Sequence, residues 1–198
     1  FEGDKGPNTG GMGTYSFDNH SLPFLSEKDI FEAQQTNERV ALELYKQTGE
    51  KFRGVLYGGF MLTGGGVKVV EYNARFGDPE AMNVLSILET DFLDICKAIV
   101  SGSLKDLEVG FAKKSTVCKY VVPEGYPNNP QKGFEVLCNP ALSGLYLAAV
   151  QSLDNKIVAT GSRAAAFVGI DKDIAVAENL AEKGVCNIGG NLFHRKDI

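Results

Sequence analysis

Several features are missing from the 198-residue sequence, and each absence narrows the class of protein. Basic residues are not in excess, because 20 Lys and Arg stand against 25 Asp and Glu. A net charge of -5 argues against a surface that coats nucleic acid. No apolar run approaches the roughly 18 residues of a membrane span, and no basic-then-apolar leader opens the sequence. We therefore expect neither nucleic acid nor a membrane as a partner.

Cysteine and histidine are also scarce, and neither forms a recognised motif. The four cysteines are scattered singly without a C-x-x-C pair, so we expect reduced thiols and a cytoplasmic protein. His20 and His194 lie far apart, with no cysteine or carboxylate at metal-ligand spacing, which argues against a zinc site. No G-x-S-x-G elbow and no known cysteine-nucleophile signature occurs, so covalent catalysis has no candidate residue.

The sequence contains enough apolar residues for a core, because 43% of its residues are hydrophobic. Its length allows one domain or two small ones. Ser26 and Asp29 resemble a capping box, and helical apolar spacing then runs to Gly49. The β-rich runs at 53–62 and 67–75 are separated by TGGG and predict a hairpin.

A second helical segment follows the hairpin, and the pattern then changes. Asp78 is a candidate helix cap with Pro79 at the first helical position, and the segment ends near 101–103 with a possible break near Thr90. From about residue 110, short strands alternate with turns.

Four strands and one helix are predicted in this later part of the chain. The strands are 115–122, 145–152, 156–162 and 164–170, and the helix begins at Asp171, runs through Lys183 and is closed by Gly184. The fold class is therefore α+β: mixed α/β over residues 1–109, then a small antiparallel β domain with one helix over 110–198.

The stretch GPNTGGMG, residues 6–13, places four glycines in eight positions. Bare backbone with adjacent Asn8 and Thr9 side chains can cradle an anion, although a plain surface loop explains the composition equally well. The spacing does not match the Walker phosphate loop or G-x-G-x-x-G.

A polar cluster lies at the end of the second hairpin strand. Alternation along a strand predicts that Glu71, Asn73 and Arg75 share one face, which also carries Val67 and Val69. Glu71 and Asn73 supply hard oxygen ligands of the kind that Mg²⁺ prefers, and Arg75 could neutralise charge on a transferred phosphoryl group. The alternative is an ordinary solvated face of an edge strand.

Other charged residues are harder to interpret from their neighbours alone. Asp78 is explained as a helix cap. Arg163 and the pair Arg195 and Lys196 could bind anions, but solvated surface positions are the more common role for such residues.

Four motifs occur together and in order: GDKGPNTGGMG, RGVLYGGFML, VVEYNARFGDPE and the terminal FHRKDI. In this combination the chain closely resembles the phosphoribosylamine–glycine ligase family, ATP-grasp enzymes of purine biosynthesis. The resemblance spans essentially the whole chain. It implies ATP-dependent ligation of glycine to 5-phosphoribosylamine, which gives glycinamide ribonucleotide, ADP and phosphate through glycyl phosphate.

The resemblance also implies roles for individual residues. Glu71 and Asn73 match the family's ligands for Mg²⁺ (or Mn²⁺), and Arg75 matches the arginine beside the reacting phosphate and substrate. The loop Pro7, Asn8, Thr9, Gly10 and Gly11 matches the loop near the substrates. Arg163 and the HRKDI end recur in the family without a role that the resemblance assigns.

The family's N-terminal domain and first ATP-binding lobe have no counterpart in this sequence. The chain is therefore expected to be the C-terminal lobe of an ATP-grasp domain followed by the small domain, monomeric, and inactive without the N-terminal half. Two other functions stay open: a different ATP-grasp carboxylate–amine ligase or carboxylase, and a noncatalytic module that binds a phosphorylated metabolite.

Overall fold

The computed structural model describes all 198 residues, and they form two compact units. The first, here the sheet unit, comprises Phe1–His20, Asp78–Ile87 and Lys113–Ile198. The second, here the hairpin unit, comprises Ser21–Gly77 and Leu88–Ala112. These units are discontinuous in sequence, and the domain boundary expected after residue 109 stays a prediction.

The hairpin unit contains the long helix α1 (Glu27–Thr48), strands β2 (Tyr57–Thr63) and β3 (Gly66–Asn73), helix α3 (Phe92–Ser101) and the 3₁₀ turn η1 (Leu104–Asp106). Ser26 forms the predicted capping box with Asp29, and Gly49 ends α1 with a φ of 76°. Glycine adopts this left-handed conformation without the steric cost of a Cβ. The predicted helix and hairpin are therefore confirmed.

Helix α1 packs on the hairpin through one face of the strands. Phe60 of β2 and Tyr72 of β3 meet edge to face, with ring centroids 6.1 Å apart. The Tyr72 hydroxyl donates to Oδ1 of Asn37 on α1 at 2.8 Å. This contact satisfies both polar groups at an otherwise apolar junction.

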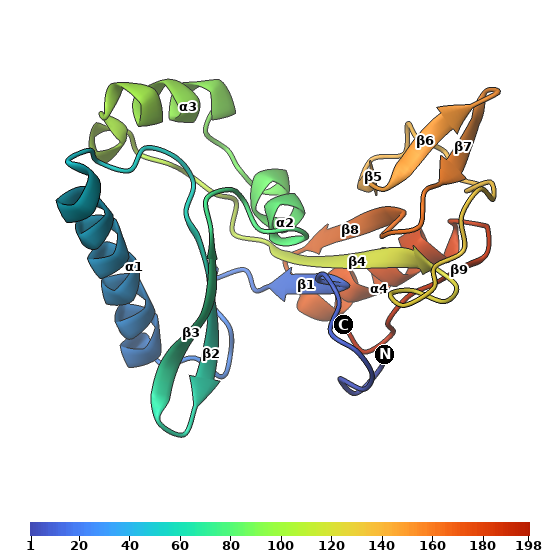
Figure 1. Cartoon of the computed structure of the whole chain (residues 1–198), viewed down its shortest axis with the longest axis horizontal. Coiled ribbons are helices and arrows are strands. Elements are labelled where there is room, and N and C mark those ends of the chain that lie inside the picture. Colours follow the sequence, from blue (N-terminus) through green and yellow to red (C-terminus); the bar gives the residue numbers. More distant parts are fainter. The chain divides into compact units, whose positions relative to one another are not determined.

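The sheet unit is built on an antiparallel sheet in the order β1-β4-β8-β5, and β9 extends one end of β4 (Figure 1). Its strands are β1 (Gly13–Ser16), β4 (Ser115–Pro123), β5 (Leu145–Leu147), β8 (Ala165–Asp171) and β9 (Leu192–Phe193). Strands β6 (Val150–Leu153) and β7 (Lys156–Ala159) form a separate pair. The single predicted strand 145–152 is therefore two short strands that join different sheets.

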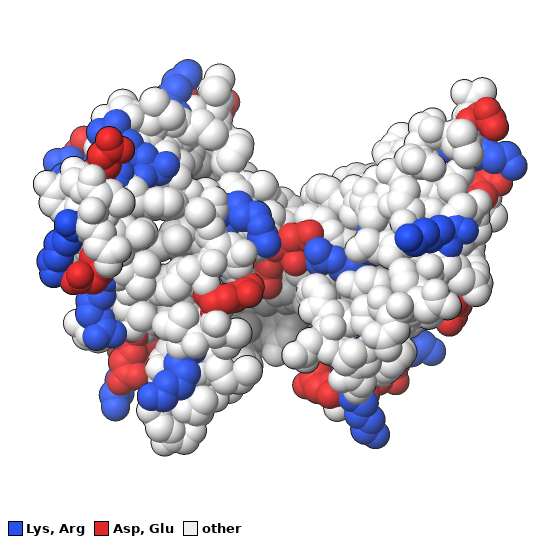
Figure 2. All heavy atoms as spheres, viewed as in Figure 1, with Lys and Arg blue, Asp and Glu red and all other residues white.

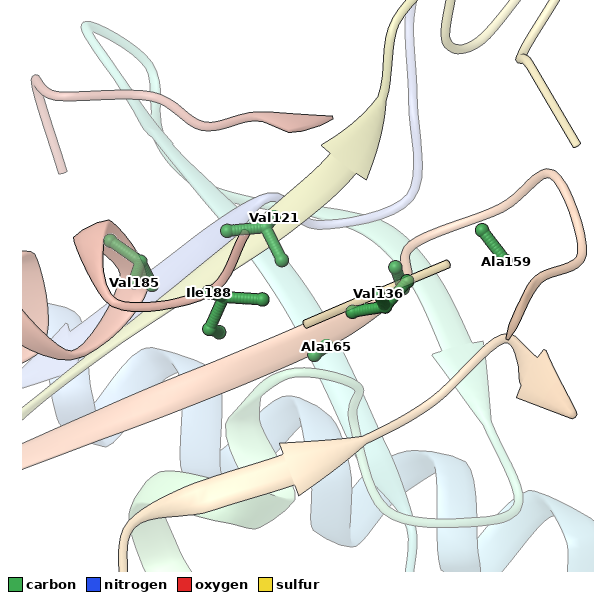
Figure 3. Close-up of a cluster of buried hydrophobic side chains, with 7 residues drawn as sticks. Val121, Val136, Ala159, Ala165, Val185 and Ile188 are labelled. Carbon is green, nitrogen blue, oxygen red and sulfur yellow. The ribbon is translucent and has the colours of Figure 1, made fainter. Parts of the chain in front are cut away.

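Every residue of the central strand β4 is buried, because helices cover both of its faces. Helix α4 (Ile174–Cys186) packs behind β4 and β8, and the short helix α2 (Glu80–Ser86) contacts β1 and β4 (Figure 1). Figure 3 shows the apolar cluster in which Val121 of β4 and Val185 of α4 meet Val136 and Ile188.

Helix α4 departs from its predicted bounds at both ends. Its N-cap is Asp173, whose side chain accepts from the Ala175 amide at 2.8 Å, whereas Asp171 accepts from the Asp173 amide. Gly184 lies inside the helix and does not end it. A Cβ at Gly184 would come within 2.1 Å of the Phe167 ring, so close helix–strand packing explains this glycine.

Positive and negative side chains are interspersed over the face seen in Figure 2. None of the helices has the length and apolar character needed to span a bilayer.

Candidate functional site

The β2–β3 hairpin places Glu71 through an irregular register. Gly59 lies opposite Glu71, but its neighbour Phe60 lies opposite Val69, so Val70 is one extra residue in β3. Directly opposed residues share a face of the sheet. Glu71 therefore faces away from the side that carries Phe60 and Val69, and the prediction that Glu71 shares a face with Val69 is wrong. A β-bulge reverses the alternation at this point.

Beyond this β-bulge, Glu71 and Asn73 do lie on one face, as predicted. The Asn73 Nδ2 group donates to Oε1 of Glu71 at 2.9 Å. Glu71 is exposed and Asn73 half-buried, and the face they share is opposite to the one that meets α1. A carboxylate and a carboxamide oxygen side by side are hard donors, and Mg²⁺ commonly takes only one or two protein ligands of this type. The donor set fits that ion.

Arg75 lies beyond the end of β3, which stops at Asn73. The strand alternation used to place it therefore does not extend to this residue. Its Nη1 group donates to the carbonyl oxygen of the next residue, Phe76, at 2.6 Å.

Asp78, in the sheet unit, is not the cap of α2, which corrects the sequence-based expectation. Pro79 is the N-cap residue, and no side chain caps this helix. The Asp78 carboxylate instead accepts from the Tyr120 hydroxyl at 2.8 Å and from Nη2 of Arg163 at 2.7 Å. Burial and the adjacent carboxylate both raise the pKa of Tyr120, which keeps the hydroxyl a donor.

Arg163 is largely buried rather than a solvated surface residue, with 18% of its side chain exposed. Its Nη1 group donates to the carbonyl oxygens of Gly11 at 2.8 Å and Asp78 at 2.9 Å. The guanidinium also lies over the Tyr120 ring, 4.6 Å from its centroid. One side chain thus joins the glycine loop to Asp78 through the planar donor fork of its guanidinium.

The glycines of the 6–13 stretch are explained in part by the protein's own packing. A Cβ on Gly11 would come within 2.6 Å of Pro79 Cδ, and one on Gly10 within 3.2 Å of the Arg163 guanidinium carbon. Gly10 and Gly11 therefore allow close approach of Pro79 and Arg163. No ligand is needed to account for them.

The preceding residues of the loop border a hollow of about 150 Å³ in the sheet unit. Its polar lining includes Lys5, Asn8, Thr9 and Arg195, beside Pro7. The structure thus divides the predicted substrate loop: Pro7 to Thr9 line open space, whereas Gly10 and Gly11 pack against protein. The role of the loop in substrate binding stays a prediction.

Arg195 is engaged by two carboxylates. It donates to Asp197 at 2.8 and 2.6 Å and pairs with Asp4 at 2.9 Å. The Asp197 hydrogen bonds raise the pKa of Arg195, and the Arg195 hydrogen bonds together with the Gly3 amide lower the pKa of Asp197. This network ties both ends of the chain together. Lys196 contributes main-chain groups instead, and its amide donates to Glu2 at 3.3 Å.

His194 has neighbours that its sequence spacing did not reveal. Its Nε2 atom lies 3.1 Å from Oε1 of Glu182, and Cys186 is next to the same carboxylate. Lys119, at the centre of β4, is fully buried and pairs with Glu182 and Glu178 at 2.7 Å each. Burial opposes ionisation of Glu182, but Lys119 and His194 outweigh it and hold the pKa of Glu182 at about 2.

Comparisons with known proteins match both parts of the chain. Residues 1–81 match the phosphoribosylglycinamide synthetase ATP-grasp (A) domain, and residues 116–198 match the phosphoribosylglycinamide synthetase C domain. The chain is 50% identical to a phosphoribosylamine–glycine ligase of Methanosarcina barkeri and 48% identical to one of Methanocaldococcus jannaschii. These alignments cover 100% of this chain but only 46% and 45% of the relatives.

A solved structure has a similar fold. The crystal structure of a phosphoribosylamine–glycine ligase from Thermotoga maritima superimposes with a TM-score of 0.82 at 28% identity, over 99% of this chain and 48% of that one. The chain thus spans about half the length of the curated relatives it matches. Because residues 1–81 and 116–198 both match models of this one family, the chain belongs to the phosphoribosylglycinamide synthetase family, with residues of its ATP-grasp (A) domain and of its C domain.

Proposed function

We propose that this chain is part of an ATP-dependent ligase that joins glycine to 5-phosphoribosylamine. The observation that carries the proposal is the alignment of its entire length with phosphoribosylamine–glycine ligases at 50% identity. In the reaction, a glycine carboxylate oxygen attacks the γ-phosphorus of ATP, which gives glycyl phosphate and releases ADP. The amine of phosphoribosylamine then attacks the carbonyl carbon, and phosphate leaves as glycinamide ribonucleotide forms.

In this proposal Glu71 and Asn73 hold a Mg²⁺ (or Mn²⁺) ion. The bound ion would neutralise charge on the ATP phosphates. Support comes from the oxygen donors that lie together on one face of β3, turned away from the α1 side by the extra residue Val70. Arg75 follows two residues later and is proposed to stabilise the charge that develops on the transferred phosphoryl group.

Pro7, Asn8, Thr9, Gly10 and Gly11 are proposed to position the substrates. Pro7 to Thr9 line the hollow beside Lys5 and Arg195 and can contact a ligand directly. Gly10 and Gly11 would act indirectly, because their contacts with Arg163 and Pro79 fix the path of the loop. Orientation of reacting groups contributes a large part of catalysis in such two-substrate reactions.

The chain covers less than half of its relatives, and we propose that the N-terminal half of the enzyme completes the ATP site. Apolar side chains of the hairpin unit are exposed, among them Met61 at 57% and Val70 at 63%. We propose that the N-terminal half covers some of these side chains, because exposed apolar surface is often a contact with another part of a protein. We place the enzyme in the cytoplasm and expect a monomer.

The test is glycine- and phosphoribosylamine-dependent release of ADP by the full-length enzyme, by its Glu71→Gln variant and by the 198-residue chain. We expect turnover by the enzyme, a loss of at least about 100-fold in Glu71→Gln, and negligible turnover by the chain alone. A matched control is Glu43→Gln on α1, whose carboxylate contacts only exposed Lys46. Full activity of Glu71→Gln, or robust activity of the isolated chain, contradicts the proposal.

Two competing functions give different results in the same protein. Another ATP-grasp ligase would release ADP with a different amine and acid pair, so substrate profiling separates it. A noncatalytic anion-binding module would release no ADP at all. Calorimetry with Mg-ADP on wild type and Glu71→Ala provides a second distinction. If the protein is a noncatalytic module, the substitution should cause no metal-dependent change in Mg-ADP binding.

A further inference from the structure

A cluster of three side chains in the sheet unit lies outside the proposed ATP and substrate sites. Glu182 and Cys186 are one turn apart on α4, and His194 follows β9. Their ligand atoms all lie within 4.8 Å of one another. His194 Nε2 is 3.1 Å and Cys186 Sγ 3.7 Å from the same atom, Oε1 of Glu182. One nitrogen, one sulfur and one oxygen atom that can each ligate a metal therefore lie close together.

Two of the three separations match edges of a tetrahedral metal site, and the third, between His194 Nε2 and Cys186 Sγ, is at most 4.8 Å. With bonds of about 2.0 Å to nitrogen and oxygen and about 2.3 Å to sulfur, a tetrahedral ion separates N from O by about 3.3 Å and S from O by about 3.5 Å. The observed 3.1 Å and 3.7 Å differ from these values by about 0.2 Å.

The surroundings favour a borderline-soft divalent ion and not Mg²⁺. Thiolate and imidazole are ligands for Zn²⁺ and related transition ions, whereas Mg²⁺ selects oxygen. Cys186 is exposed, which leaves the fourth position open to water. His194 and Glu182 are 14% and 28% exposed, so both are held in place by their surroundings.

Lys119 both orients the cluster and limits its affinity. Its ammonium donates to Oε2 of Glu182 at 2.7 Å, and His194 Nε2 lies 3.1 Å from Oε1 and 3.2 Å from Oε2, whereas Cys186 Sγ lies 3.7 Å from Oε1. Hydrogen bonds to the remote oxygen of a ligating carboxylate fix its orientation in known metal sites. The same positive charge repels a cation, so binding weaker than in a four-ligand structural zinc site follows.

We propose that Glu182, Cys186 and His194 bind one Zn²⁺-class divalent ion, with Cys186 as thiolate and water as the fourth ligand. Binding would release the thiol proton and tie the C-terminal segment after β9 to α4. This inference does not depend on the proposed ligase function, because none of its residues belongs to the ATP or substrate sites described above.

The test uses Co²⁺ as a spectroscopic probe with purified protein, both as the 198-residue chain and as the full-length enzyme. We expect tetrahedral d–d bands and a thiolate-to-cobalt charge-transfer band that saturate at one equivalent and disappear when Zn²⁺ is added. Cys186→Ser should abolish the charge-transfer band and weaken binding at least about tenfold, and His194→Gln should weaken it similarly. Cys96→Ser, on α3 of the other unit, is the matched control and should retain the full spectrum.

Folding of each variant is checked by far-UV circular dichroism, and a thermal melt with and without Zn²⁺ provides a second measurement. A ligand that binds only the folded state raises the Tm of wild type and Cys96→Ser, and the rise is lost in Cys186→Ser. Absence of a saturable spectrum in folded wild-type protein overturns the proposal. An unchanged spectrum in folded Cys186→Ser also overturns it.

Discussion

Arg163 offers the sharpest test of how the sheet unit holds the glycine loop. Substitution Arg163→Met keeps most of the apolar stem but removes the guanidinium. The carbonyl oxygens of Gly11 and Asp78 then lose a donor each, and the Asp78 carboxylate loses its ion pair. The Tyr120 ring also loses the cation above it.

The expected cost is about 2–4 kcal/mol in the free energy of unfolding. Each of the two lost hydrogen bonds to a carbonyl oxygen costs about 1 kcal/mol. The ion pair adds up to about 1 kcal/mol, because the Asp78 side chain is 48% exposed and water screens it. The contact with the Tyr120 ring contributes about 0.5–1 kcal/mol. Arg163→Lys should fall between wild type and Arg163→Met, because an ammonium cannot reproduce the planar fork.

The measurement is urea unfolding at 25 °C followed by far-UV circular dichroism, with linear extrapolation to water. Hydrogen exchange of the β4 amides shows whether the sheet unit loses stability in Arg163→Met. Lys156→Met is the control, because its ion pair with Glu135 is exposed and should be worth under about 1 kcal/mol. A double-mutant cycle with Asp78→Asn should give a coupling of about 1 kcal/mol. If Arg163→Met stays within about 0.5 kcal/mol of wild type, Arg163 does not join the two segments as described.

Three further outcomes follow from close contacts and burial. Gly11→Ala should destabilise the protein by about 1–3 kcal/mol in urea unfolding, because the new Cβ meets Pro79 at 2.6 Å. Gly184→Ala should also destabilise the protein in the same assay, because the added Cβ lies 2.1 Å from the Phe167 ring. This steric cost should outweigh the higher helix propensity of alanine, which is worth about 1 kcal/mol. Greater stability of Gly184→Ala would contradict this packing. Burial raises the pKa of the Cys118 thiol to about 12, so the thiol stays protonated at pH 8. Mass spectrometry should find Cys118 unmodified by iodoacetamide until urea unfolds the sheet unit. Labelling of Cys118 in the folded protein would refute this prediction.

Elements specified by neighbouring residues could be predicted from the sequence. The capping box of Ser26 and Asp29 and the left-handed Gly49 determine both ends of α1 within a few residues. The β2–β3 hairpin follows from two β-rich runs and a glycine turn. These signals depend only on neighbouring residues, so the sequence predicts the helix and the hairpin correctly.

The face of Glu71 and the role of Asp78 depend on information that local patterns lack. Only the pairing of β3 with β2 identifies Val70 as an extra residue, because the sequence of β3 does not mark the β-bulge. Asp78 precedes Pro79 and resembles a cap, but its partners Tyr120 and Arg163 lie 42 and 85 residues away. The local helix-cap pattern therefore predicts the wrong role for Asp78, because its carboxylate forms an ion pair with the distant Arg163.

Lys119 is another side chain whose role depends on contacts between distant residues. It also explains why the sequence does not predict the cluster around His194. A lysine in the middle of a β-rich run suggests a strand with one solvated face, yet this side chain is fully buried. Its burial is possible because Glu178 and Glu182, one turn apart on α4, face β4 and supply two carboxylates. Once Lys119 fixes Glu182, the neighbouring Cys186 and the returning His194 meet at that carboxylate. A site of this kind is created by the docking of α4 on the sheet, and no spacing along the sequence encodes it.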